Sequence, residues 1–225
     1  MHFRAILFDF DFTLADSTAG AVECVNHALL ACGFPAAERE AIRRSVAYPL
    51  PEVLARLTGV EDDAAAAAFA QAFINRADEV MAPLTTLFPG VVPAVTELRA
   101  RGLSTGIVST KFRYRIQSIL ANHDAGDLFD VIVGGEDVRQ HKPHPESLQR
   151  ALARLELGPT EALYIGDHPV DAQAAEAAGV PLVIVLSGVA REDEFAGLPR
   201  LAVLGSVAEL PAWTRQLSPN GERWA

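Results

Sequence analysis

The chain has 225 residues, half of them hydrophobic and 21% charged, so it is long and apolar enough to bury a substantial core. Its formal net charge of −10 argues against nucleic acid or an anionic membrane as the main partner, because too few cations are available to neutralise phosphates. The only two cysteines, Cys24 and Cys32, have a spacing that indicates neither a disulfide framework nor a zinc site.

Short apolar segments bounded by turn residues predict the strands. They lack polar alternation, which is typical of parallel strands buried on both faces. The predicted strands are residues 5–8, 106–108 with the preceding 103–105, 131–133, 162–165 and 182–186. Helical patterns from residue 88 onward are expected to end at Gly102, Gly158 and Gly179, since glycine can adopt the left-handed conformation that closes a helix. This alternation predicts an α/β fold with a doubly wound parallel sheet.

The region from residue 16 to 84 interrupts the alternation, because its patterns are helical only. Val22, Val25 and Leu29 form one apolar stripe, a second helix is expected to run from Pro51 to Gly59, and an Ala-rich helix follows. Asp16 and Ser17 are the predicted N-caps of the first helix. We therefore expect residues 1–15 and 85–225 to form the core, and residues 16–84 to form an inserted helical domain.

Polar residues gather directly after the predicted strands, where ligands bind in open parallel sheets. Clustered carboxylates raise one another's pKa unless a cation lies among them, and all-oxygen ligands favour Mg²⁺. The pattern predicts a magnesium site beside an anion bound by hydroxyl and ammonium groups. The residues concerned are Asp9, Asp11, Ser109, Thr110, Lys111, Lys142, Asp167 and Asp171.

Four segments carry a family resemblance. DFDFTLADS, IVST, KPHPE and GDHPVDAQAAEAAG resemble, in this order, the four motifs of the haloacid dehalogenase superfamily, and the match extends from Phe3 to about Phe195. The resemblance implies a Rossmann-like core with residues 16–84 as an all-helical cap that closes over the site. It also implies a Mg²⁺-dependent phosphatase, similar to phosphoglycolate phosphatases, that acts on a small phosphorylated metabolite.

The resemblance further implies a role for each matched residue. Asp9 would attack phosphorus and form an aspartyl-phosphate, while Asp11 would protonate the leaving oxygen and later deprotonate the water. Ser109 and Lys142 would bind the phosphoryl oxygens, with Thr110 as a second hydroxyl. The Asp9 side chain, the Asp11 carbonyl and the Asp167 side chain would hold the metal. Asp171 would also belong to the metal site, binding the ion directly or through water.

Other residues near the motifs carry weaker expectations. Thr13 is expected to hold the first loop through hydrogen bonds to its backbone. Lys111 is either catalytic support or an exposed charge. Phe12 stands where the family most often has glycine, which puts substrate size in question. The candidate cations of the helical insert are Arg43, Arg44 and Arg56.

Two alternatives to the phosphatase stay open. A sugar phosphomutase of the same family keeps both acids and the same type of cap. A phospho-receiver signalling module also combines an Asp, a hydroxyl, a Lys and Mg²⁺, but it has no helical insert. We expect a cytoplasmic protein, since no stretch reaches the ~18 apolar residues that a membrane span needs. The sequence does not predict the oligomeric state.

Overall fold

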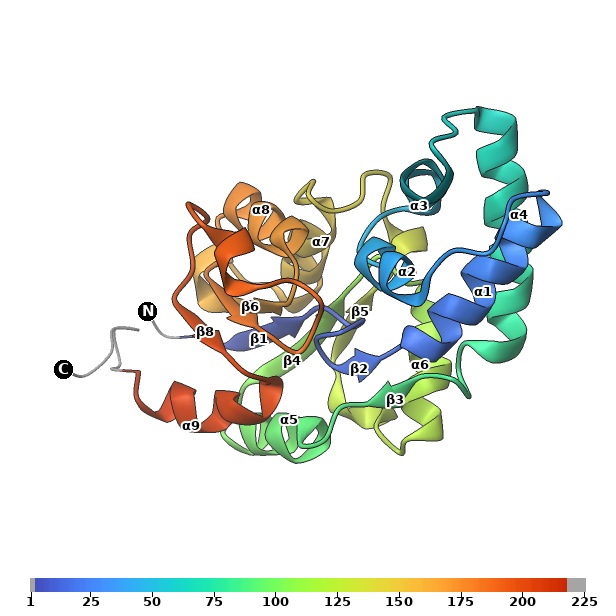
Figure 1. Ribbon diagram of the computed structural model, residues 1–225. Coiled ribbons are helices and arrows are strands. Elements are labelled where there is room, and N and C mark those ends of the chain that lie inside the picture. Colours follow the sequence, from blue (N-terminus) through green and yellow to red (C-terminus); the bar gives the residue numbers. More distant parts are fainter. Residues whose placement is uncertain (1–2, 218–225) are drawn as a thin grey trace.

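The computed structural model describes residues 3–217, and its centre is a parallel sheet of six strands (Figure 1). The strand order is β5-β4-β1-β6-β7-β8, and β1 lies between β4 and β6. The strands are β1 (Ala5–Phe8), β4 (Ser104–Val108), β5 (Val131–Val133), β6 (Ala162–Gly166), β7 (Leu182–Val185) and β8 (Ala202–Leu204). The doubly wound α/β fold predicted from the apolar segments is confirmed.

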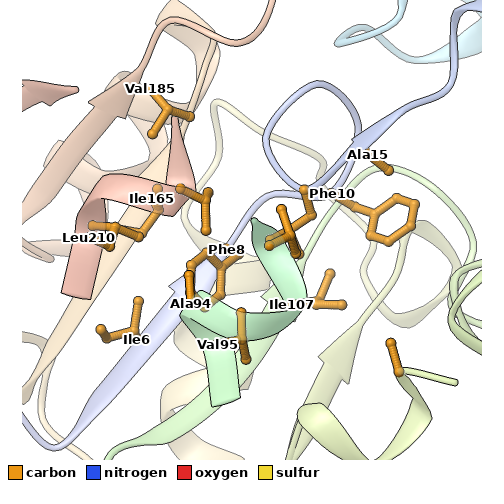
Figure 2. Close-up of a cluster of buried hydrophobic side chains, with 14 of the residues drawn as sticks. Ile6, Phe8, Phe10, Ala15, Ala94, Val95, Ile107, Ile165, Val185 and Leu210 are labelled. Carbon is orange, nitrogen blue, oxygen red and sulfur yellow. The ribbon is translucent and has the colours of Figure 1, made fainter. Parts of the chain in front are cut away.

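Each face of the sheet packs against its own layer of helices, because side chains of a strand alternate between the faces. Ile6 and Phe8 of β1 belong to the cluster shown in Figure 2, whereas Ala5 and Leu7 belong to the cluster on the other face. The first cluster includes residues of α5 (Val91–Ala100), α6 (Arg113–Asn122) and α9 (Leu210–Arg215). The second includes residues of α7 (Glu146–Leu155) and α8 (Pro169–Ala178).

The sequence-based assignment of the sheet and its helices differs from the structure in some details. The edge strand β8 was not predicted. Helix α7 was expected to end at Gly158, but it ends at Leu155, and Glu156 adopts the left-handed conformation with φ of 57°. Gly179 closes α8 as expected, with φ of 69°.

The interruption between β1 and β4 is a block of four helices with its own apolar centre, hereafter the helical block. Leu29, Ile42, Leu54 and Phe69 are all buried there, one from each helix. The helices are α1 (Thr18–Ala31), α2 (Arg39–Ser45), α3 (Leu50–Thr58) and α4 (Asp63–Val80). The cluster explains why an Ala-rich helix is stable, since Phe69 and its neighbours give α4 a buried face.

Short elements connect the helical block to the sheet. Strands β2 (Ala15–Asp16) and β3 (Thr86–Leu87) pair antiparallel where the chain leaves the core and returns to it. Asp78 of α4 accepts hydrogen bonds from Tyr114 at 2.6 Å and from Arg115 at 2.7 Å, both on α6.

In the described part of the chain, none of the helices has the length and apolar character needed to cross a membrane.

Candidate active site

Asp9 occupies the first position after β1, near the middle of the sheet. Its backbone N–H donates to the Ile165 carbonyl at 2.8 Å, which continues the β1–β6 ladder by one residue. The side chain therefore leaves the sheet at its carboxyl edge, where the loops after β4 and β6 also begin. Asp9 is 7% exposed, so its carboxylate is almost completely withdrawn from bulk water.

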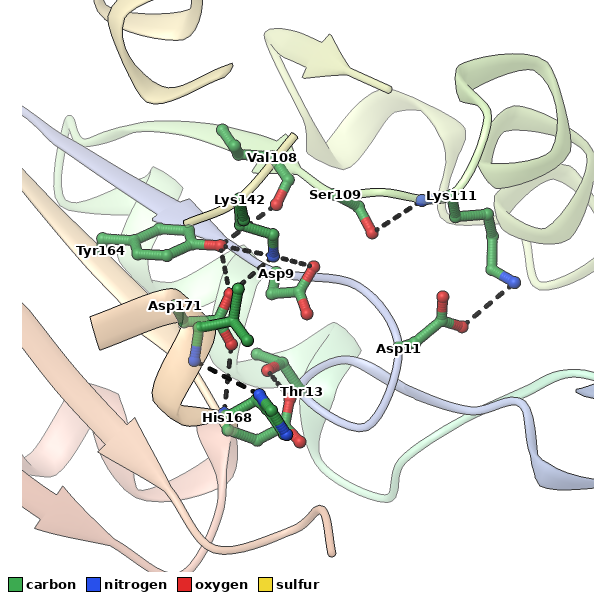
Figure 3. A network of polar contacts seen from close by, with 12 residues as sticks. Asp9, Asp11, Thr13, Val108, Ser109, Lys111, Lys142, Tyr164, His168 and Asp171 are labelled. Carbon is green, nitrogen blue, oxygen red and sulfur yellow. Dashed lines mark hydrogen bonds and ion pairs between the residues drawn. The ribbon is translucent and has the colours of Figure 1, made fainter. Parts of the chain in front are cut away.

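Lys142 is the buried cation beside Asp9 (Figure 3). Its Nζ lies 3.0 Å from Asp9 Oδ1 and 2.6 Å from Asp171 Oδ1. The Tyr164 hydroxyl donates to the same Asp171 oxygen at 2.9 Å, while the His168 backbone N–H donates to the other oxygen at 3.1 Å. Asp171 is thus engaged through both oxygens, and it orients the ammonium toward Asp9.

A second acid, Asp167, approaches Asp9 from the loop after β6. Oxygens of Asp9, Asp167 and Asp171 lie within 4.8 Å of one another. Thr13 was expected to bond to the backbone of its own loop, but its Oγ1 donates to Asp167 Oδ1 at 2.8 Å. A Cβ built on Gly188 would meet Asp167 Oδ2 at 1.9 Å, which shows that backbone packs directly against this carboxylate.

The charge balance of this cluster is unfavourable without a further cation. Burial raises the pKa of Asp9 to about 7 even though Lys142 acts in the opposite direction. Burial and the carboxylates of Asp171 and Asp9 raise the pKa of Asp167 well above its usual range. Burial alone would lower the pKa of Lys142, but Asp171 and Asp9 raise it, so the ammonium stays charged.

The donor set fits Mg²⁺. It consists of carboxylate oxygens, the ligands that hard divalent cations prefer. Within the described residues, the buried Oδ1 of Asp9 makes no hydrogen bond, although Lys142 lies close to it. Asp9 and Asp167 retain more capacity for an ion than Asp171 does, since protein donors already engage both oxygens of Asp171.

Asp11 lies on the other side of the loop and pairs with a different lysine. Lys111 Nζ is 3.1 Å from Asp11 Oδ1, and both side chains are more than nine-tenths buried, so Lys111 is not an exposed charge. Phe12 directly follows Asp11 and has φ of 63°, a backbone conformation that favours glycine. Ser187 Oγ donates to the Phe12 carbonyl at 2.7 Å and helps to hold this turn.

The two hydroxyl residues after β4 have different surroundings. Ser109 is 3% exposed, and its Oγ accepts the Lys111 backbone N–H at 3.3 Å. Thr110 lines a small hollow together with Asp9, Asp11 and Asp167. Both hydroxyls follow the strand next to β1, as their place in the sequence predicts.

Sequence reasoning missed Tyr164 because it lies inside an apolar strand, where an aromatic residue usually indicates packing. Its hydroxyl nevertheless contacts Lys142, Asp171 and the Val108 carbonyl. A clearer signal was available in the lysines: the chain has only two, Lys111 and Lys142, and the side chains of both are more than nine-tenths buried beside the acids.

The three candidate arginines of the helical block also differ. Arg43 lines the hollow above Asp9, and its guanidinium lies 5.4 Å from the centre of the Phe12 ring. Arg56 stacks on Tyr48 at 3.6 Å and pairs with Glu52. Arg44 pairs with Glu40 at a largely exposed position. Arg43 alone of the three lines the acid cluster.

Comparisons with known proteins agree with this geometry. Residues 6–185 match the family described as haloacid dehalogenase-like hydrolase. A phosphoglycolate phosphatase from Rhodospirillum rubrum is 30% identical over 229 residues, covering 98% of this chain and 94% of that protein. A haloacid dehalogenase-like hydrolase from Bacteroides fragilis has a crystal structure with a TM-score of 0.89 and 42% identity, covering 92% of this chain and 99% of that one. CbbY from Rhodobacter sphaeroides, solved in complex with phosphate, is 28% identical with a TM-score of 0.78, covering 92% and 96%.

Proposed function

The chain belongs to the haloacid dehalogenase-like hydrolase family, and we propose that it is a Mg²⁺-dependent phosphatase that hydrolyses a small phosphomonoester through an aspartyl-phosphate. The observation that carries the proposal is the position of Asp9. This buried carboxylate at a strand end lies against one ammonium group and two further acids, with oxygens arranged closely enough to share a cation. The phosphoglycolate phosphatase from R. rubrum supports the same type of reaction.

In the first step, an Asp9 oxygen attacks phosphorus and the bond from phosphorus to the leaving oxygen breaks. Asp11 donates a proton to that oxygen, so the product leaves as a neutral alcohol. In the second step, Asp11 removes a proton from water, whose oxygen attacks the aspartyl-phosphate. Asp9 and inorganic phosphate are then released, and one difficult displacement has been divided into two easier ones.

The charged groups around Asp9 reduce repulsion between its carboxylate and a dianionic phosphoryl group. Lys142 offers a fixed ammonium, held by Asp171 and Tyr164, within reach of the Asp9 carboxylate and of an incoming oxygen. The side chains of Asp9 and Asp167 and the backbone carbonyl of Asp11 would hold Mg²⁺. When bound, the ion would supply positive charge to the phosphoryl oxygens and offset the buried carboxylates.

Ser109 and Thr110 would donate hydrogen bonds to the phosphoryl oxygens from the loop after β4. We assign the helical block as the cap, because Arg43, Val46 and Ala47 from its α2 region line the same hollow as Asp9 and Asp167. Covering this hollow would keep bulk water from the reacting groups. The substrate would be a small phosphorylated metabolite.

The test measures release of inorganic phosphate from 4-nitrophenyl phosphate by three proteins, each with Mg²⁺ or with EDTA. Wild type and the exposed control Asp127→Asn should turn over only with Mg²⁺. Asp9→Asn should lose at least about 10⁴-fold in kcat, as expected for removal of a nucleophile. Equal rates for wild type and Asp9→Asn, or full activity in EDTA, would contradict the mechanism.

The same assay separates hydrolysis from the two alternatives. A receiver module would stay phosphorylated and release far less than one phosphate per protein per minute. A phosphomutase would pass the phosphoryl group to a second hydroxyl of a sugar phosphate rather than to water. Steady multiple turnover into inorganic phosphate is the result expected for a phosphatase.

A further inference from the structure

A cavity of about 290 Å³ lies beside Asp11, between the helical block and the core. Asp11, Thr110 and Lys111 form its floor on the core side. Residues of α1, α4 and the segment from 45 to 53 form most of the remaining wall, and Phe112, Arg115 and His141 complete it from the core side. Asp9 and Asp167 do not line this cavity; they line a separate small hollow. Asp11 and Thr110 line both spaces.

This arrangement assigns different parts of a substrate to the two spaces. In the proposed reaction the phosphoryl group lies against Asp9, and the leaving oxygen must lie within hydrogen-bond distance of Asp11. Because Asp11 borders both spaces, the carbon side of the ester would extend from Asp11 into the cavity. The lining of the cavity therefore indicates which alcohols the enzyme accepts.

The lining is mainly hydrophobic. Side chains from three different segments of the helical block form this apolar surface, so it does not depend on a single helix. The hydroxyl of Ser17 is an uncharged polar group on the wall, and it is buried without a hydrogen-bond partner in the described structure. The apolar residues of the wall include Val25, Val46, Val53, Phe73, Ile74 and Met81.

The cations among the described lining residues already have other partners. Lys111 is paired with Asp11, and Arg115 is engaged by Asp78 and by the Ile74 carbonyl at 3.0 Å. Burial lowers the pKa of His141, which favours the neutral imidazole at pH 7. A carboxylate on the leaving group would have to compete with Asp11 for Lys111 or lie unpaired in an apolar space, which is costly.

We propose that the preferred substrate is the phosphate ester of an uncharged alcohol with an apolar, ring-sized body, and that this body binds in the cavity beside Asp11. The proposal rests on the phosphatase function proposed above. The cavity is at the lower end of the ~300–1,000 Å³ typical of ligand pockets, which suits one or two rings rather than a large nucleotide. An uncharged leaving alcohol distinguishes the proposed substrate from phosphoglycolate, whose leaving group carries a carboxylate.

Three esters of primary alcohols test the proposal: benzyl phosphate, ethyl phosphate and 2-phosphoglycolate. They are compared by kcat/KM with Mg²⁺ at pH 7, with wild-type protein. One methylene in a hydrophobic pocket is worth about tenfold or more, so benzyl phosphate should exceed each of the other two by at least about tenfold. Using alkyl esters throughout avoids the higher intrinsic reactivity of aryl phosphates.

A cavity-filling variant tests whether the preference for benzyl phosphate arises in this cavity. Ala70 on α4 lines the cavity, so Ala70→Trp should lower the ratio of kcat/KM for benzyl over ethyl phosphate by about tenfold. Ala68→Trp puts the same side chain at an exposed position of the same helix, and should keep the wild-type ratio. Thermal melts show whether both variants fold, and the wild-type comparison stands without them.

The outcomes separate the inference from the function on which it rests. A preference for benzyl phosphate that collapses in Ala70→Trp alone supports the proposal. Preference for 2-phosphoglycolate, or equal use of benzyl and ethyl phosphate, would overturn the apolar pocket and leave the phosphatase in place. If wild type hydrolyses none of the esters, nor 4-nitrophenyl phosphate, with Mg²⁺, the proposed function fails and the inference fails with it.

Discussion

The carboxyl edge of the sheet and the cavity wall of the helical block lie on either side of Asp11, but they are built in opposite ways. At the sheet edge, Asp9, Lys142, Asp167 and Asp171 are charged groups buried at high electrostatic cost and held in place by one another. The helical wall is a set of ordinary apolar side chains that also pack a small core. In the proposed mechanism, the chemistry is thus concentrated at the strand ends, whereas selectivity depends on apolar surfaces that can change without disturbing it.

The largest effect on stability should come from removing the cation at the sheet edge. Lys142→Met leaves Asp9 and Asp171 buried without their counter-ion, so we expect a loss of about 3–5 kcal/mol in the free energy of unfolding. We also expect kcat to fall by at least about 10²–10³-fold, as for removal of one preorganised donor. Denaturant unfolding and the nitrophenyl phosphate assay measure the two effects. Lys111→Met should destabilise less, because Lys111 pairs with one acid only; an equal loss would contradict this distinction.

The next effect concerns pH and metal in the acid cluster. Burial raises the pKa of Asp9 from 3.8 to about 7, so between these values the native metal-free protein binds more protons than the unfolded chain. Its stability should therefore fall as pH rises from 4 to 7. Mg²⁺ at a hundredfold excess over its Kd should restore about 2.7 kcal/mol at pH 7, or roughly 5 to 10 °C in Tm.

Melting curves at pH 5, 6 and 7, with EDTA and with Mg²⁺, check this expectation. Asp9→Asn removes the titrating carboxylate, so it should flatten the pH dependence of the metal-free protein and reduce the Mg²⁺ effect. A wild-type Tm in EDTA that rises steadily from pH 5 to 7, with no flattening in the variant, would show that the Asp9 pKa is not raised.

A smaller effect is expected where backbone packs against Asp167, the proposed metal ligand. Gly188→Ala would bring a Cβ to within 1.9 Å of Asp167 Oδ2, so the carboxylate must shift. We expect Mg²⁺ affinity to weaken by about 10–100-fold, as for other changes that displace a ligand's support. Isothermal titration with Mg²⁺ measures it. Gly126→Ala, which meets nothing within 4 Å, is the control, and equal affinities for the two variants would refute the close contact.

The smallest effect should appear in the helical block far from the acids. Asp62 caps α4 by accepting the Ala65 N–H at 2.8 Å, so Asp62→Ala should cost about 1 kcal/mol of stability. The kcat for nitrophenyl phosphate should stay within about twofold, since surface changes away from a site usually act within fractions of a kcal/mol. A large fall in kcat would contradict the separation between the helical block and the reacting groups at the sheet edge.

Where the predictions about site residues failed, the missing information was a contact between distant segments. Thr13 was expected to bond within its own loop, but its hydroxyl reaches Asp167, which is 154 residues away along the chain. Tyr164 resembled a packing residue, because nothing in an apolar strand reveals that its hydroxyl meets Lys142 and Asp171. Lys111 was ambiguous until its neighbour Asp11 could be seen.

The sequence by itself determined the layered α/β fold and the strand ends at which acids, hydroxyls and lysines follow. Apolar runs of this length can only be buried on both faces, and the carboxyl ends of parallel strands share one edge. Only the tertiary structure decided which acid pairs with which lysine and where the apolar cavity lies. Those features depend on side chains from four or more segments that meet in space. The local periodicity of the sequence does not specify contacts between distant segments.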